Sequence, residues 1–372
     1  MALPVCLLTA TPVYQVVDLG SLGGGSGAAT ALNSSGLAVG WGLTASQSIQ
    51  AFRSNGGGVA QALDPFTQGR AQGVNDSGRT VGVRFDAYGN AEAVSWSADG
   101  LSVSTLGGGV NSYAMAINAN GAIVGAADGR AVRFTDSGPV SIAMSGAAWS
   151  SANAVNSNGA VAGTAQLTNG TFRAFTAGSS SGSTATMLGT LGGGASYGQA
   201  INSTSSVAGG STTARGYLHA FLYSRGKLQD LGTLAGGNNS SAYGVNDAGQ
   251  VVGYSQVSGG DSSAFLFENG QMRDLNQLIA ADLGWRLSEA SAINNNGQIV
   301  GFGMKDGVQR AFRLDPIAVA FASSARVAVT QDISAPARDI AAEVPEPRTW
   351  LSLITAGAAG IAIGSIRRRV RR

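Results

Sequence analysis

A ten-residue segment built around an Asn-x-x-Gly turn recurs along the chain at a nearly fixed interval. The copies are ALNSSGLAVG (31–40), GVNDSGRTVG (73–82), AINANGAIVG (116–125), AVNSNGAVAG (154–163), AINSTSSVAG (200–209), GVNDAGQVVG (244–253) and AINNNGQIVG (292–301). Their anchoring asparagines are Asn33, Asn75, Asn118, Asn156, Asn202, Asn246 and Asn294, spaced by 42, 43, 38, 46, 44 and 48 residues. Such a period is typical of stacked or radial repeats rather than of independent domains.

Each copy predicts four short strands. Around Asn246, an alternating segment (241–246) reaches the Asn, and Gly249 suits the left-handed position of a type I turn with a G1 bulge. The Asn side chain can bond backbone amides two residues on. A return strand follows, then a third strand at 264–267 and a fourth at 271–275. Ser205 stands where the other copies have Gly, so we expect its hairpin to be strained or rearranged, at a cost of about 1 kcal/mol.

Seven such units predict an all-β fold, a seven-bladed β-propeller of four-stranded antiparallel blades. The last unit ends at 311–316 without a fourth strand, whereas the chain begins with an orphan strand (13–25) that matches the fourth strand at 227–237. We therefore expect the N-terminal strand to complete the last blade and close the ring, which leaves no open sheet edge. A β-helix with two rungs per period is the alternative.

The composition agrees with a folded β protein and limits its partners. Gly is abundant (56 residues) and only 12% of residues are charged, while 44% are hydrophobic, enough to bury a core. The formal charge of +2 hides an asymmetry, because five of the 23 basic residues lie in the last six positions and the rest of the chain is mildly acidic. No basic stripe with interleaved aromatics is visible, so nucleic acid is not an expected partner.

The first twelve residues hold the chain's only cysteine, Cys6, within the apolar start MALPVCLLTA. We expect residues 1–12 to be a truncated signal peptide, because a short apolar stretch is followed by small residues but no basic segment precedes it. A plain first strand is the alternative. The rest of the chain can form neither an intrachain disulfide nor a thiolate metal site.

The repeats resemble the HAF family of probable extracellular repeats, named for a tripeptide that stands here as His219-Ala220-Phe221. The resemblance covers roughly residues 13–316. It is carried by DLGTLGG-like stretches, by the Asn-x-x-Gly turns, and by Ala-Phe pairs at 51/52, 174/175, 220/221, 264/265 and 311/312. It implies little about activity.

The C-terminal segment 344–372 resembles a PEP-CTERM sorting signal, with the motif Pro345-Glu346-Pro347, an apolar stretch from Trp350 to Ile366, and a basic tail that includes Arg367, Arg368 and Arg369. Seventeen helical residues span about 25 Å, near the lower limit for a membrane-crossing helix, and the arginines favour a cytoplasmic end. A C-terminal transmembrane helix is therefore predicted. Residues 317–343 are interpreted as a linker.

The sorting resemblance implies recognition by an exosortase, with cleavage near the Pro-Glu-Pro motif and delivery of the body to the cell surface or the extracellular matrix. It also implies Gram-negative bacteria that make exopolysaccharide and biofilm. Extracellular polysaccharide or surface proteins are then expected partners, and the membrane is at least a transient one. A permanent single-span anchor is the alternative.

Residues that could carry chemistry are few. His219 occupies a repeat position that holds Ser263 and Arg310 in other units, which indicates a strand surface rather than a catalytic site. Asp76 and Asp247 follow the turn Asn in only two units and are interpreted as turn-stabilising residues. The remaining acids are interpreted as solvated edge residues (Asp18, Asp230 and Asp274) or as candidates that no spacing pairs (Asp261, Asp282 and Glu289).

These observations predict a structural or binding protein without catalytic residues, cofactor or metal. The LGGG stretches lack the Lys-Ser/Thr of a phosphate loop and are interpreted as inter-blade turns. The rival prediction is a secreted polysaccharide-active enzyme, which would need two or three carboxylates in one groove at the mouth of the propeller channel.

Overall fold

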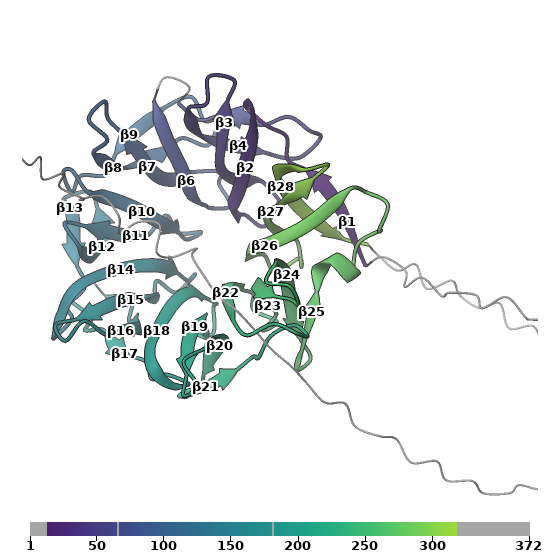
Figure 1. Cartoon of the computed structure of the whole chain (residues 1–372). Coiled ribbons are helices and arrows are strands. Elements are labelled where there is room, and N and C mark those ends of the chain that lie inside the picture. The colour runs from purple at the N-terminus through teal and green to yellow at the C-terminus, as the bar shows by residue number, and fades with distance from the viewer. Residues whose placement is uncertain (1–12, 65–66, 181, 318–372) are drawn as a thin grey trace, which may run out of the picture.

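The computed structural model describes residues 13–64, 67–180 and 182–317. Within these residues the chain forms seven four-stranded antiparallel sheets, which stand as blades around a ring (Figure 1). The predicted seven-bladed β-propeller is therefore confirmed. The predicted linker, sorting signal and transmembrane helix lie outside the described residues, apart from Ile317.

The first three blades follow one another along the chain. Blade 1 comprises β2 (Gly23–Leu32), β3 (Ala38–Thr44), β4 (Ile49–Ser54) and β5 (Gln61–Ala62). Blade 2 comprises β6 (Gln68–Val74), β7 (Thr80–Phe85), β8 (Ala91–Trp96) and β9 (Val103–Thr105). Blade 3 comprises β10 (Ser112–Ile117), β11 (Ile123–Ala127), β12 (Arg130–Thr135) and β13 (Gly138–Ser141).

The remaining blades continue the same order. Blade 4 comprises β14 (Ala147–Val155), β15 (Val161–Leu167), β16 (Phe172–Ala177) and β17 (Thr186–Met187). Blade 5 comprises β18 (Gly192–Ile201), β19 (Val207–Thr213), β20 (Leu218–Ser224) and β21 (Lys227–Asp230). Blade 6 comprises β22 (Ser240–Val245), β23 (Val251–Gln256), β24 (Ser262–Glu268) and β25 (Gln271–Asp274), and the 3₁₀ turn η1 (Leu275–Gln277) follows it. Blade 7 comprises β26 (Trp285–Ile293), β27 (Ile299–Lys305), β28 (Val308–Pro316) and β1 (Tyr14–Asp18).

Blade 7 is assembled from both ends of the propeller. β1 pairs antiparallel with β28, and the register places Val16 opposite Leu314. The amides of Val13 and Tyr14 both donate to the carbonyl oxygen of Leu278, at 2.8 and 3.0 Å. Closure of the ring by the N-terminal strand is thereby confirmed, although the strand ends at Asp18 and the LGGG stretch after it begins β2 instead of forming only a turn.

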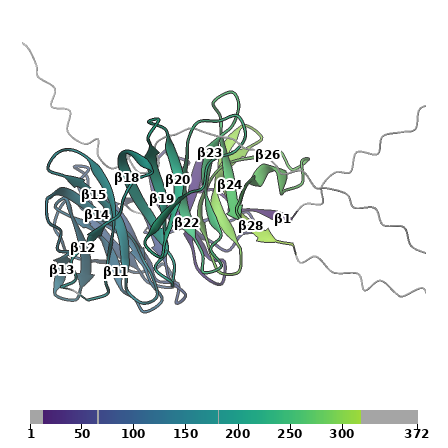
Figure 2. The same cartoon turned by 90° about the horizontal axis from the view of Figure 1, so that it is seen from below.

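The first strand of each blade lies innermost, because the first strands of neighbouring blades contact one another around the ring. The fourth strands, such as β13, β17 and β21, lie at the outside (Figure 1). Seen from the side, the strands run across the thickness of the ring (Figure 2). All turns between first and second strands therefore lie on one face, around the central channel.

The core lies between blades. One apolar cluster, for example, joins Val81 and Ala93 of blade 2 to Ala114, Ile123 and Val132 of blade 3. The Phe of each Ala-Phe pair is almost fully enclosed in such a cluster, and Phe175, Phe221, Phe265 and Phe312 are all 0% exposed. Burial of a Phe side chain stabilises a fold by roughly 1.5–3 kcal/mol, which explains why the pair recurs.

Candidate functional site

The Asn-x-x-Gly turns have the predicted geometry. In blade 6 the Gly249 amide donates to the Asn246 carbonyl oxygen and the Asn246 amide donates to that of Gln250, both at 3.1 Å. Gly249 has a φ of 78°, in the left-handed region where a Cβ is disfavoured. Ser205 adopts the same conformation, with a φ of 61°, and its turn keeps both backbone bonds. The hairpin of blade 5 is thus strained but not rearranged.

The Asn side chains do more than stabilise their own turns. Each Oδ1 accepts a hydrogen bond from the amide four residues on, at 2.8 to 3.0 Å. Each Nδ2 donates to the backbone carbonyl of the Asn in the next blade. These Nδ2 bonds run from Asn33 to Asn75 (3.1 Å), Asn75 to Asn118 (3.4 Å), Asn118 to Asn156 (2.8 Å), Asn156 to Asn202 (2.9 Å), Asn202 to Asn246 (3.1 Å), Asn246 to Asn294 (3.2 Å) and Asn294 to Asn33 (2.9 Å).

These bonds form a closed belt, the Asn ring, which links every blade to the next. The last bond joins residues 261 positions apart in sequence and so ties blade 7 to blade 1. Most of these side chains are 3–7% exposed. Because both ends of each amide are already hydrogen-bonded, the Asn ring holds the frame together and has little capacity left for a ligand.

A second repeated feature fixes the inner strand. Each first strand carries a β-bulge three residues before its Asn, as at Ala114/Ala116 in blade 3. Opposite the bulge stands the Gly that ends each ten-residue copy. A Cβ on these glycines would lie 1.9–2.1 Å from a carbonyl oxygen of the first strand, far inside any real contact, at Gly40, Gly82, Gly125, Gly163, Gly209, Gly253 and Gly301.

The Asn ring encloses a hollow of about 300 Å³ at one mouth of the channel. Three consecutive residues of every blade line it: an aliphatic residue, the Asn, and the residue after the Asn. The aliphatic floor is Leu32, Val74, Ile117, Val155, Ile201, Val245 and Ile293. The rim is Ser34, Asp76, Ala119, Ser157, Ser203, Asp247 and Asn295.

Rim side chains also connect blades. Asp76 Oδ1 accepts from the Ser34 amide at 2.9 Å, and Asp247 Oδ1 accepts from the Ser203 amide at 2.8 Å. Asn295 makes the equivalent bond to the Asp247 amide at 2.9 Å and donates its Nδ2 to Asp247 Oδ2 at 2.7 Å. Partial burial acts to raise the pKa of Asp247, but the bonds from Ser203 and Asn295 outweigh it and hold that pKa below its usual value. Asp247 is therefore a carboxylate at neutral pH, and both rim acids stabilise contacts between blades.

The expectation that His219 lies on a strand surface is wrong. Its side chain is buried, and Nδ1 lies 2.8 Å from both carboxylate oxygens of Asp230. Within the described residues Nε2 is enclosed and has no hydrogen-bond partner. An imidazole with its outer nitrogen enclosed cannot reach a substrate, so the geometry gives His219 a structural role.

Of the fourth-strand acids, Asp230 is exposed as the sequence indicated, whereas Asp18 and Asp274 are only partly exposed. Asp18 forms ion pairs with Lys305 and Arg310, at 3.1 and 3.0 Å, and its side chain is only 19% exposed. Asp18, Asp230 and Asp274 each accept a hydrogen bond from the amide two residues on, at 2.8–2.9 Å. These acids shape the turn that leaves the fourth strand.

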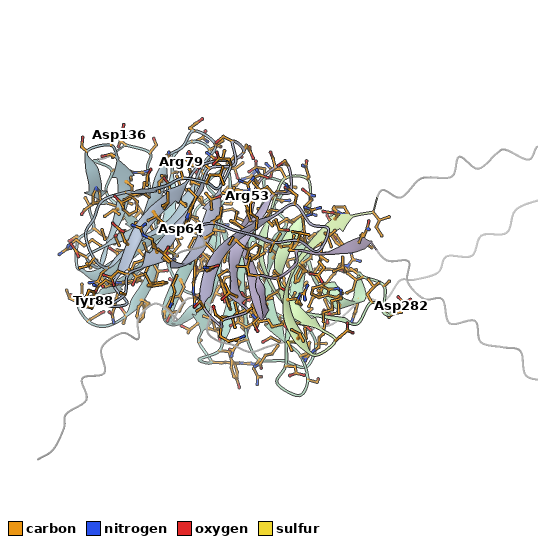
Figure 3. The ribbon with its side chains drawn as sticks, turned by 90° about the horizontal axis from the view of Figure 1, so that it is seen from above. Arg53, Asp64, Arg79, Tyr88, Asp136 and Asp282 are labelled. Carbon is orange, nitrogen blue, oxygen red and sulfur yellow. The ribbon has the colours of Figure 1, made fainter. Side chains whose placement is uncertain are left out.

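The structure does not pair the other candidate acids. Asp261 forms an ion pair with Arg286 at 2.6 Å, and Asp282 lies in an exposed loop before β26 (Figure 3). Burial raises the pKa of Glu289, on β26, to about 7. No described hydrogen bond or ion pair joins Glu289 to either aspartate. Nor do three His, Cys, Asp or Glu side chains gather as metal ligands in the described part of the chain.

Comparisons with known proteins show no family for this chain. No family model matches the chain, and no curated protein matches it. Among solved structures, a gluconolactonase from Xanthomonas campestris is 13% identical, with a TM-score of 0.41 over 83% of this chain and 92% of its own. The BP39L lectin from Burkholderia pseudomallei is 9% identical, with a TM-score of 0.41 over 82% and 98%. The WD40 propeller domain of Doa1 is 11% identical, with a TM-score of 0.41 over 80% and 97%. Such remote similarities carry neither activity nor ligand to this chain.

The predicted sorting residues Pro345, Glu346 and Pro347 fall outside the described residues, as do the predicted membrane residues Trp350 to Arg369. Within the described residues, no helix has the length and apolar character needed to cross a membrane. Sequence reasoning missed the hydrogen bonds by which the Asn ring joins neighbouring blades. The only feature of the sequence that could have indicated them is the recurrence of Asn at this position.

Proposed function

We propose that the chain is an exported propeller, sorted through its C-terminal segment, that acts as a binding or structural protein at the cell surface or in the extracellular matrix. The observation that carries the binding role is the hollow at the channel mouth. Its frame, the Asn ring and the bulge glycines, repeats in every blade, whereas its rim residues differ from blade to blade. A constant frame with variable positions is a usual way to place a ligand site on a repeat fold.

Export and sorting rest on the C-terminal sequence. The motif Pro345-Glu346-Pro347, the apolar stretch and the arginine tail together fit recognition by an exosortase and at least transient insertion in the inner membrane. An extracellular polysaccharide of a Gram-negative biofilm is the proposed environment and a proposed partner.

The sorting proposal is tested by the mature C-terminus in a host with and without an exosortase. Mass spectrometry should find the segment 350–366 removed only when the exosortase is present, and Glu346→Ala should block removal. Asp332→Ala, in the interpreted linker, is the matched control and should be processed normally. Protease treatment of intact cells should degrade the propeller, and full protection would contradict export. Surface exposure with the segment retained would favour the permanent anchor.

The polysaccharide-active enzyme receives no support from the geometry. Its carboxylates would have to face one another across a groove. The two acids of the rim stand on blades 2 and 6, on opposite sides of the mouth, and the hydrogen bonds to Asp247 lower its pKa, which does not suit a general acid. Release of reducing ends from matrix polysaccharide by the purified chain, abolished by Asp76→Asn or Asp247→Asn, would restore this candidate.

A further inference from the structure

The charged side chains that line the hollow are all acidic. In the described part of the chain its lining includes the carboxylates of Asp76 and Asp247 and no Lys, Arg or His. Arg79, Arg133 and Arg313 do not line the hollow: Arg79 donates to Ser95 Oγ at 3.1 Å, and Arg133 and Arg313 donate to the turn carbonyls of Gly159 and Gly36 at 3.0 and 2.8 Å. A site with this lining repels anions and attracts cations.

The floor and wall limit the ligand further. The floor is entirely aliphatic, so it offers no aromatic face on which a sugar ring could stack, but it can cover a hydrocarbon chain. The wall amides of the Asn ring are already bonded, so they cannot recognise a set of hydroxyl groups. The groups left to contact a ligand are therefore the aliphatic side chains of the floor and the carboxylate oxygens of the rim.

The carboxylates are positioned in advance. Each Oδ1 is fixed by an amide of a neighbouring blade, and Asp247 Oδ2 also accepts from Asn295 Nδ2, but every carboxylate oxygen keeps a lone pair for a second donor. Asp76 and Asp247 stand on non-adjacent blades across the mouth, which does not suit a single compact metal ion that needs several converging oxygens. It suits a ligand with two separated positive ends.

We infer that the channel mouth binds an aliphatic organic dication, an α,ω-diamine whose ammonium groups pair with Asp76 and Asp247 while its hydrocarbon chain covers the aliphatic floor. This rests on the proposed role of the mouth as a ligand site. The volume of about 300 Å³ is at the lower end for small-molecule sites and accommodates a short diamine. Binding weakens as salt rises, because the rim is open to solvent.

The blades themselves supply a conservative variant. Asn295 occupies the rim position in blade 7 and makes the same inter-blade bond as Asp76 and Asp247. Asp76→Asn with Asp247→Asn therefore removes both charges and keeps the bonds from the Ser34 and Ser203 amides, although Asp247→Asn loses the bond from Asn295 Nδ2. Asp136→Asn is the matched control, because Asp136 is exposed on the same face as Arg79 but does not line the hollow (Figure 3).

The test is calorimetric titration of the full-length chain, held in a neutral detergent, with cadaverine, with the neutral isostere pentane-1,5-diol, with glucose and with calcium chloride. Cadaverine should bind, at least about tenfold more tightly than the diol. The double variant should weaken cadaverine at least tenfold, and the Asp136→Asn chain should not. Matching thermal melting curves show that the variants are folded.

Absence of cadaverine binding, or equal binding by the double variant, overturns the inference. Tighter binding of glucose or calcium overturns it as well, but leaves the mouth as a ligand site. Failure of the proposed surface role is a separate result, because it would appear in the processing and protease experiments whatever the titrations show.

Discussion

At the scale of single residues, Glu289 has the most unusual environment among the described acids. It lies on β26, the innermost strand of blade 7. No described residue donates a hydrogen bond to its carboxyl group or forms an ion pair with it. Desolvation raises its pKa from 4.5 to about 7. Burial, followed by the charge of Glu289, also raises the pKa of Tyr254 in the neighbouring blade. An acid of this kind makes stability depend on pH.

The sign of that dependence follows from the raised value. Between pH 4.5 and 7 the folded chain keeps a proton that the unfolded chain releases, so stability is complete below pH 4.5 and is lost as pH rises to about 7. The loss should be about 2–3 kcal/mol. Glu289→Gln should therefore match the natural chain at pH 4 and be more stable at pH 8 by that amount in urea unfolding. Parallel stability curves for the two chains would contradict the assignment.

Ser205 gives a second prediction at this scale. Its φ of 61° places a Cβ in the left-handed region, which costs an L-residue roughly 1–2 kcal/mol. Ser205→Gly should raise the free energy of unfolding by about 0.5–1 kcal/mol, because the relief of strain is partly offset by the greater conformational entropy of Gly in the unfolded chain. The reciprocal change Gly249→Ser, at a site where a Cβ meets no atom within 4 Å, should lower it by a similar amount. Changes of opposite sign in the free energy of unfolding for the two variants would confirm the strain at Ser205, and changes of the same sign would contradict it.

At the scale of elements, the bulged inner strand explains the Gly that ends each repeat. In blade 3 a Cβ on Gly125 would lie 1.9 Å from the carbonyl oxygen of Tyr113. Gly125→Ala should therefore separate β10 from β11 and destabilise the chain by about 3 kcal/mol or more. Gly189→Ala is the control, because its Cβ would meet nothing within 4 Å. Hydrogen exchange should show faster opening of β10 and β11 in the first variant only, and equal protection would contradict the steric argument.

The Asn ring supports a further prediction, on the joints between blades. Asn156 donates to the Asn202 carbonyl and accepts from the amides of Ala160 and Asn158. Asn156→Ala leaves these buried groups without partners and should cost about 2–4 kcal/mol. Asn156→Asp keeps the hydrogen-bond acceptor but loses the donor. Its melting temperature should therefore lie between those of the natural chain and the Asn156→Ala variant. Ser157→Ala is the control, because no described hydrogen bond involves the Ser157 side chain, and a loss in Asn156→Asp as small as in this control would contradict the inter-blade role.

These elements also show where sequence reasoning succeeds and where it stops. The turn was predictable from Asn246 and Gly249, because a turn is decided by residues three apart. The partner of the Asn246 Nδ2 lies 48 residues away, and no local pattern indicates it. The burial of His219 was missed because a position shared with Ser and Arg resembles a surface. In the structure each of these residues is accommodated by a different partner, such as Asp230 for His219 and Asp18 for Arg310.

At the scale of the whole molecule, the repeat count and the phase of the strands were enough to predict the ring and its closure. The hollow was not predictable in the same way. Its floor and rim residues come from every blade, and only the radius set by the packed blades brings them together. The variable residues Asp76 and Asp247 were recognisable in the sequence, but it could not show that they line one hollow.

Closure by β1 makes the stability of the whole ring depend on its first strand. β1 buries Tyr14 against blades 6 and 7, and Leu19 just after it is 0% exposed between blades 7 and 1. Asp18 forms ion pairs with both Lys305 and Arg310. Without this strand the edge of β28 is open to pairing with another chain. The lost burial alone is worth roughly 3–5 kcal/mol.

Deletion of residues 1–19 should therefore lower the melting temperature by about 5–8 °C and promote self-association, because a ring of about 300 residues loses roughly 1.6 °C per kcal/mol. Hydrogen exchange should accelerate first in β28 and then in β27 and β2, which contact it. Deletion of residues 1–12 is the control, since it leaves β1 intact, and should preserve both melting temperature and protection. If the 1–19 deletion has the same melting temperature as the control and β28 stays protected, the ring does not need the N-terminal strand. In that case the Asn294–Asn33 bond and the contacts between blades 1 and 7 are sufficient to close it.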